Sequence, residues 1–247
     1  MGSAMTKESK WKLFFTPMML DQYSKKDIWA GLGITSVAML GIFVVSIIFG
    51  FVEITQISFH LKNMTYYTGL ILLSSGYEEF VFRCIILTFL LMVFKKPWLA
   101  ILITSIYFGY VHLNNDHATF LSAFSNGLGG VMYGLAFVYT RKIWFPWALH
   151  FAWNYVQGPI LGFPVSGFNV EGILKLNILD HSWLSGGLYG PEGGIVGIAF
   201  RLIVILLIVL WMKRSRGDLR RVYFNTINYK CNLFKLKEGQ NDMLPIR

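Results

Sequence analysis

The chain has 247 residues, of which 55% are hydrophobic and only 14% are charged, and its mean hydropathy is +0.53. This balance excludes an ordinary soluble domain and indicates one polytopic membrane domain, with no room for a large soluble module beside it. The formal charge of +9 does not indicate nucleic acid, because the basic residues lie in the loops and tails between hydrophobic segments.

In chain order, residues 1–27 mix lysines with apolar side chains such as Trp11 and Phe14, which is typical of a segment at the membrane interface. Hydrophobic stretches long enough to cross a bilayer follow. We therefore predict an all-α membrane helix bundle of about six transmembrane helices, with amphipathic interfacial helices. The expected spans lie at about 28–52, 66–94, 98–113, 118–139, 143–163 and 195–212.

The segments between and after these spans complete the predicted organisation. Residues 53–65 form a short polar connection, whereas the Gly-rich residues 164–194 could form a loop, a re-entrant segment or a substrate gate. Residues 28–212 are the expected transmembrane domain, and residues 213–247 are a basic cytoplasmic tail. Within the tail, apolar residues at helical spacing from Asp218 to Lys237 predict a basic amphipathic helix on the inner leaflet.

The distribution of basic residues predicts the orientation. If the amino terminus lies inside, 18 of the 22 Lys and Arg fall on the inner side: five before the first span, two at 95–96, two at 141–142 and nine after 212. Lys62 and Lys175 fall outside. The positive-inside rule therefore predicts a multi-pass plasma-membrane protein with both termini in the cytoplasm.

Three ionisable residues lie near the middle of the second span: Glu78, Glu79 and Arg83. Each charge near a bilayer centre costs roughly 2.5–3.5 kcal/mol, so these residues need partners or a wet cavity. Glu79 and Arg83 are four apart and can pair on one helical face. Glu78 is turned about 100° away and can point into a cavity. The same residues could instead form a buried ion-pair cluster that only holds helices together.

Two further spans carry polar residues at matching spacing. Phe108 and His112 lie in the third span, and His150 and Asn154 lie four apart in the fifth. A single histidine in a membrane helix can simply satisfy an interhelical hydrogen bond. Two histidines, an asparagine and a carboxylate pair on three spans indicate a common polar site.

Together, Glu-Glu-x-x-x-Arg (78–83), Phe-x-x-x-His (108–112) and His-x-x-x-Asn (150–154) resemble the CAAX-protease and bacteriocin-processing (CPBP, or Abi) family of intramembrane proteases. The resemblance covers about residues 66–212 and implies hydrolysis of peptide bonds within the membrane. It implies that Glu78 is the general base and His112 its partner in activating a water. It further implies that His150 and Asn154 form an oxyanion hole. The supporting residues that it implies are Glu79, Arg83 and Phe108.

A metal is compatible with the same residues. Proteins of this family are often labelled metalloproteases, and Glu78, His112 and His150 offer one carboxylate and two imidazoles to a divalent metal such as zinc. We expect no cofactor and favour the metal-free glutamate mechanism. The chain contains no His-Glu-x-x-His zinc motif, no serine-protease loop and no aspartyl-protease motif.

The sequence is compatible with several substrates and partners. Prenylated CAAX proteins, leader peptides and bacteriocin or quorum-sensing precursors all fit a membrane-associated peptide substrate, and the bacterial look of the chain favours the latter two. The alternative is a non-catalytic scaffold or bacteriocin self-immunity protein that binds a membrane-protein partner through the same cluster. A transporter would need an inverted repeat or a second buried acid, and neither is evident in the sequence.

Overall fold

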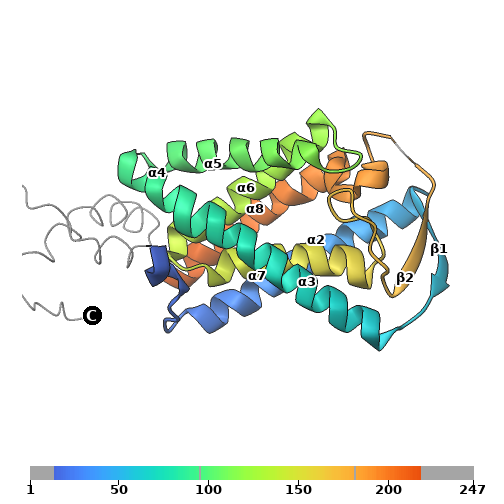
Figure 1. Ribbon diagram of the computed structural model, residues 1–247, viewed down its shortest axis with the longest axis horizontal. Coiled ribbons are helices and arrows are strands. Elements are labelled where there is room, and N and C mark those ends of the chain that lie inside the picture. The colour runs from blue at the N-terminus through green and yellow to red at the C-terminus, as the bar shows by residue number, and fades with distance from the viewer. Residues whose placement is uncertain (1–13, 95, 181, 218–247) are drawn as a thin grey trace, which may run out of the picture.

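The computed structural model describes residues 14–94, 96–180 and 182–217 of the chain. Most of these residues are helical, and the helices run roughly along one long axis (Figure 1). The helices are α2 Ser24–Ile48, α3 Leu61–Glu79, α4 Thr88–Val93, α5 Pro97–Val111, α6 Phe120–Thr140, α7 Trp144–Tyr155 and α8 Ile195–Arg216. The amphipathic helix predicted for residues 218–237, and most of the basic segment before the first span, lie outside the described residues.

The protein is a helical membrane protein. Among the described residues, α2, α6 and α8 are each long and apolar enough to cross a bilayer. α3 continues through a π-helix, Phe80–Leu87, directly into α4. The predicted span at 66–94 is thus helical as far as Val93 but changes its hydrogen-bonding pattern in the middle. Six crossings remain a prediction.

The all-α prediction is wrong in one respect, because the structure contains a two-stranded antiparallel sheet. Strand β1, Val52–Ile57, lies in the expected polar connection, and β2, Leu174–Ile178, lies in the Gly-rich connection. In the register, Val52 lies opposite Ile178 and Ile57 opposite Leu174. The two strands are far apart in sequence, and each is stabilised as a strand only by pairing with the other.

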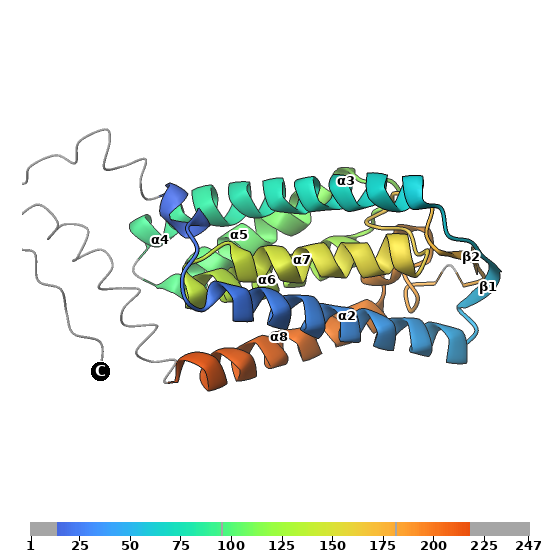
Figure 2. The ribbon, with the colours of Figure 1, turned by 90° about the horizontal axis from the view of Figure 1, so that it is seen from below.

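Helix α7 occupies the middle of the bundle, in contact with α2, α3 and α6 (Figure 2). Its inward face buries Phe145, Leu149 and Trp153 completely. α8 packs on α2 and α6, and α5 packs along α6. The polar residues of α7 are therefore enclosed on three sides by other helices, which is the position that a buried polar site in a membrane bundle requires.

An ion pair joins the start of α2 to the end of α8. Arg216 Nη2 lies 2.6 Å from Asp27 Oδ2, and the Trp211 indole donates a 3.2 Å hydrogen bond to Asp27 Oδ1. The Arg216 guanidinium also lies over the ring of Tyr23, 4.6 Å from its centroid. α2 begins and α8 ends at the same end of the bundle, and the sheet lies at the opposite end (Figure 1).

The close approach of α5 and α6 depends on Gly109, and we expect Gly109→Ala to lower stability by about 1–3 kcal/mol through overpacking. A Cβ at this position would overlap the carbonyl oxygen of Ala123, which belongs to rigid helix backbone. Thermal unfolding in detergent measures the loss. Gly127→Ala is the matched control, because its Cβ would lie 3.4 Å from the Ser105 carbonyl oxygen, an ordinary contact. Equal unfolding temperatures for the two variants would contradict the expectation.

Candidate active site

Glu78 and Glu79 are the last two residues of α3, at the junction with the π-helix. π-helical turns are rare in proteins, and those that occur often lie at functional sites. The Glu79 side chain is fully buried, whereas the Glu78 side chain keeps 32% of its surface exposed. Neighbouring carboxylates on one helix thus occupy different environments, because they are turned about 100° from each other.

Glu79 connects two helices through its two oxygens. Its Oε2 lies 3.0 Å from Arg83 Nε, one turn along the same helix. Its Oε1 lies 2.9 Å from His150 Nδ1 on α7. Since a carboxylate only accepts hydrogen bonds, His150 donates its Nδ1 proton to Glu79 and its Nε2 faces away from it.

His112 is held in the same manner by its own helix. Its Nδ1 lies 2.6 Å from the backbone carbonyl oxygen of Phe108, which can only accept a hydrogen bond. Phe108 also packs its ring against the His112 ring, with centroids 4.5 Å apart. In both neutral imidazoles the proton is therefore on Nδ1, and Nε2 presents a lone pair.

Both Nε2 atoms lie near the same carboxylate oxygen. The Nε2 atoms of His112 and His150 each lie 4.0 Å from Glu78 Oε2. This oxygen is buried and has no hydrogen-bond partner among the described residues. A water with hydrogen bonds of about 2.8 Å can bridge such a gap without any movement of the side chains.

The three residues open into a pocket of about 440 Å³, a volume typical of ligand sites. Asn154 lines the same pocket, so the structure brings together all four residues to which the resemblance gives a catalytic role. The predicted spans left His112 near the outer end of its helix and His150 in the inner half of its own. The structure removes this apparent difference in depth, because both imidazoles reach Glu78.

The sequence did not point to Tyr133, which lies on α6 beneath the site. Its ring stacks on the His150 ring with centroids 4.6 Å apart and an angle of 13° between the planes. The Arg83 guanidinium lies 5.4 Å from the Tyr133 centroid and 5.0 Å from that of Phe108. Aromatic faces therefore cover both partners of Glu79 and fix their orientation.

The sequence also missed a second buried ion pair in the wall of this pocket. Glu192 lies in a short turn, Pro191–Gly193, and its Oε2 lies 2.9 Å from Arg201 Nη2 on α8. The Trp153 indole donates a 3.1 Å hydrogen bond to the same oxygen. Glu192 Oε1 accepts 2.6 Å hydrogen bonds from the backbone N–H and the hydroxyl of Ser166. The expectation of no second buried acid is therefore wrong.

Arg201 has further partners on α6, because it donates hydrogen bonds to the Ser125 carbonyl and, at 3.1 Å, to Asn126 Oδ1. Asn126 in turn donates to the Tyr189 hydroxyl at 2.5 Å. Burial raises the pKa of Tyr189 to about 12, so this phenol stays neutral. A charged residue inside an apolar span needs a partner, so Arg201 was the signal in the sequence that could have revealed the pair.

Residues 60–156 match the family model described as type II CAAX prenyl endopeptidase Rce1-like. The match covers less than half of the chain, and over these residues the chain is similar to the CAAX-protease family. The match confirms the resemblance seen in the three sequence motifs, and it supports a membrane hydrolase of the CAAX-protease type. No curated protein and no solved structure matches the chain significantly. The match to the CAAX-protease family includes every residue from Glu78 to Asn154 and ends before Glu192 and Arg201.

Glu78, His112 and His150 are candidate metal ligands by residue type, so the distances between their ligand atoms matter. Tetrahedral zinc with bonds of about 2.0–2.1 Å holds its ligand atoms about 3.4 Å apart. The 4.0 Å separations at Glu78 Oε2 are longer than this. Among the described residues, no three His, Cys, Asp or Glu side chains are grouped so that they could hold a metal ion. The two imidazoles would need to move toward Glu78 to share one.

We expect Tyr133→Leu to slow cleavage by about 2- to 10-fold, because an aromatic pair contributes about 0.5–1.5 kcal/mol beyond its buried area. The loss of the flat face lets the His150 ring rotate away from Glu78. Tyr133→Phe retains the ring and is the matched control, and it should cleave at close to the original rate. Initial rates at saturating peptide measure the difference. If both variants lose the same activity, the phenol hydroxyl and not the stacked ring matters.

Proposed function

We propose that the protein is an intramembrane endopeptidase that hydrolyses peptide bonds of membrane-associated peptides with a water activated by Glu78. The observation that carries this proposal is the buried Glu78 oxygen without a partner, 4.0 Å from the Nε2 atoms of His112 and His150. Glu79 faces a guanidinium and an imidazole at 3.0 and 2.9 Å, whereas Glu78 Oε2 faces the two imidazoles only, at a distance that a water can bridge.

In the proposed reaction, a water lies between Glu78 Oε2 and His112 Nε2. Both atoms accept hydrogen bonds, so together they hold the two protons of the water and leave an oxygen lone pair for the substrate. The water oxygen attacks the carbonyl carbon of the peptide bond, and Glu78 takes one proton. The same proton then passes to the amide nitrogen as the C–N bond breaks.

The oxyanion that forms during attack needs donors. Asn154 offers its side-chain amide, and a well-placed donor of this kind contributes about 3–4 kcal/mol. His150 can donate from Nε2 only when it is protonated, because its Nδ1 proton already belongs to the hydrogen bond with Glu79. The proposal therefore requires that His150 Nε2 has taken up a proton from water in the open pocket before the attack, so that it donates beside the Asn154 amide.

A bound metal would supply a Lewis acid for the same carbonyl and a lowered pKa for a bound water. Glu78 and the Nε2 atoms of His112 and His150 would hold it, with Glu79 and the Phe108 carbonyl orienting the imidazoles from behind. The longer separations between the candidate ligand atoms support the metal-free version.

The test is cleavage of a tagged, membrane-associated leader peptide by the purified protein in liposomes, with and without a strong chelator. The proposal expects cleavage that the chelator leaves unchanged. Loss of cleavage with the chelator, and its return with added zinc, would establish the metal-dependent version. Absence of cleavage across a panel of leader, bacteriocin-precursor and CAAX peptides would favour the non-catalytic scaffold.

A further inference from the structure

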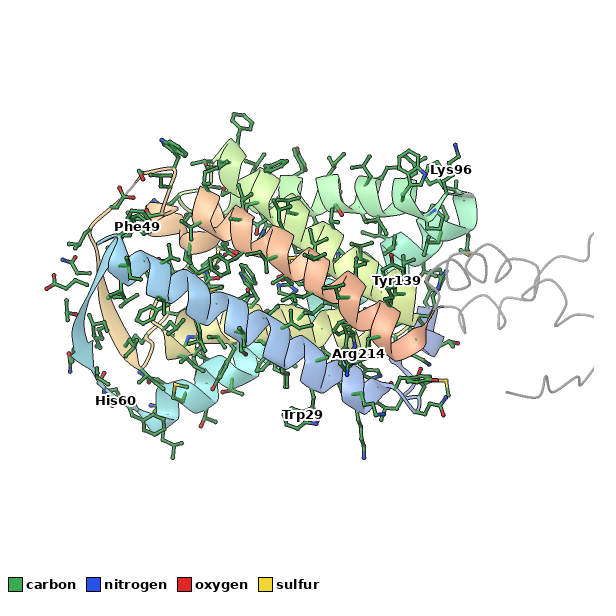
Figure 3. All side chains as sticks on the ribbon, turned by 180° about the vertical axis from the view of Figure 1, so that it is seen from behind. Trp29, Phe49, His60, Lys96, Tyr139 and Arg214 are labelled. Carbon is green, nitrogen blue, oxygen red and sulfur yellow. The ribbon has the colours of Figure 1, made fainter. Side chains whose placement is uncertain are left out.

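The two ends of the bundle differ in charge. One end holds the start of α2, the α4–α5 and α6–α7 turns and the end of α8. Its basic residues are Lys25, Lys26, Lys96, Arg141, Lys142, Lys213, Arg214 and Arg216. Figure 3 labels Lys96 and Arg214 toward this basic end, and Phe49 and His60 at the other.

The opposite end holds the β1–β2 sheet and the connection that precedes α8. Its described basic residues are Lys62 and Lys175, and its exposed acidic residues include Glu53, Asp116 and Glu171. Basic residues next to membrane helices remain on the cytoplasmic side. The basic end is therefore the cytoplasmic one, and the sheet end faces outward.

The pocket of Glu78 opens toward the sheet end. Its deep wall is made by Phe82 and Phe108, and its rim includes Leu70 and Ser74 on α3 and the exposed Phe168 of the Gly-rich connection. α3 and α5 diverge from the α4–α5 turn toward the sheet end (Figure 1). The rim residues Leu70 and Ser74 are exposed on α3, so the pocket is also open sideways, toward the outer half of the bilayer.

We propose that the active site is entered from the extracytoplasmic side, and that its substrate is an apolar peptide segment at the outer surface of the membrane. The segment belongs to an exported precursor or to the external flank of a membrane protein, and not to the cytoplasmic carboxyl terminus of a prenylated protein. The entrance follows from the position of the pocket and from the charge of the two ends. The identity of the occupant as a substrate rests on the proposed function.

The rim supports an apolar, extended occupant. Phe168 keeps 59% and Leu70 48% of their surface exposed at the entrance. Asn115 and Val170 line the same pocket, together with Glu78 and His112. A peptide strand that lays apolar side chains on this rim would bring its backbone to Glu78 without first crossing the bilayer.

The first experiment measures the orientation by cysteine labelling in intact cells, with Cys231→Ser to remove the cysteine in the tail. Gln56→Cys lies exposed on β1, and Met19→Cys lies exposed at the basic end. A membrane-impermeant maleimide should label Gln56→Cys in intact cells and Met19→Cys only after permeabilisation. The reverse pattern would overturn the proposal.

The second experiment tests the pocket itself. Ser74→Cys lies on the rim, and Ser75→Cys is the matched control, because Ser75 is fully buried on the same helix. The impermeant reagent should label Ser74→Cys in intact cells and leave Ser75→Cys unlabelled. Labelling of Ser74→Cys only from the cytoplasmic side of inverted vesicles would overturn the proposed entrance, whatever the catalytic activity.

The third experiment places one cleavable segment on either the external or the cytoplasmic flank of a carrier transmembrane helix. Only the external version should be cleaved in cells, and both should be cleaved in detergent. Cleavage of the cytoplasmic version in cells would overturn the inference while the proposed function stands. If neither is cleaved in detergent, the proposed function fails, and the two labelling experiments still decide the entrance.

Discussion

Glu78→Gln should abolish most of the peptidase activity, with a loss of about 10²–10⁴-fold in the rate of cleavage. Glutamine retains the shape of the side chain and can accept a hydrogen bond, but it cannot take a proton from water at neutral pH. The binding of peptide should change little, because the pocket walls remain. Initial rates in liposomes at several peptide concentrations separate the two effects, and the loss should appear in kcat.

The folded structure should tolerate Glu78→Gln, since the buried oxygen that it replaces has no hydrogen-bond partner among the described residues. Thermal unfolding in detergent should therefore stay close to that of the original protein. Glu53→Gln is the matched control, because Glu53 is exposed on β1 and is not among the residues that line the pocket. Undiminished cleavage by Glu78→Gln would refute the glutamate mechanism. A cellular phenotype that survives this substitution would favour the scaffold.

The sequence predicts those contacts of the candidate site that depend only on the spacing of residues along one helix. Glu79 and Arg83 are one helical turn apart, and so are Phe108 and His112; the structure places both pairs in contact. Ionisable residues in apolar spans are expensive, which singled out the helix that carries Glu78 and Glu79. These arguments need only the geometry of one helix and the dielectric of the membrane.

Contacts between distant segments were not predictable in this way. β1 and β2 become strands through mutual pairing, and their sequences separately read as connections. Glu192 lies in a Gly-rich segment for which the sequence left a loop, a re-entrant segment and a substrate gate open, and only the fold brings it to Arg201 and Trp153. The stacking of Tyr133 on His150 likewise depends on how α6 crosses α7. Tertiary packing determines each of these three contacts, and no local sequence pattern predicts them.

The second large effect is expected for Glu192→Ala, which should lower the free energy of unfolding by about 3–5 kcal/mol. The substitution leaves the Arg201 guanidinium buried without its carboxylate partner. It also removes the acceptor for the Trp153 indole and for two hydrogen bonds from Ser166. Thermal unfolding and limited proteolysis of the 164–194 connection measure the change. Glu171→Ala, exposed in the same connection, is the matched control and should behave like the original protein.

A double variant separates the two roles of Glu192. Replacing a buried ion pair by apolar residues of similar volume is often neutral or stabilising, so Glu192→Met with Arg201→Met should recover much of the stability lost in Glu192→Ala. Cleavage should remain low, because Ser166 and Trp153 still lack the carboxylate that anchors them. Trp153 directly precedes Asn154, so its loss of an anchor affects the position of the proposed oxyanion donor. If activity returned together with stability, Glu192 would serve only to neutralise Arg201, and the position of the pocket wall would depend on the packing of α7 and α8 alone.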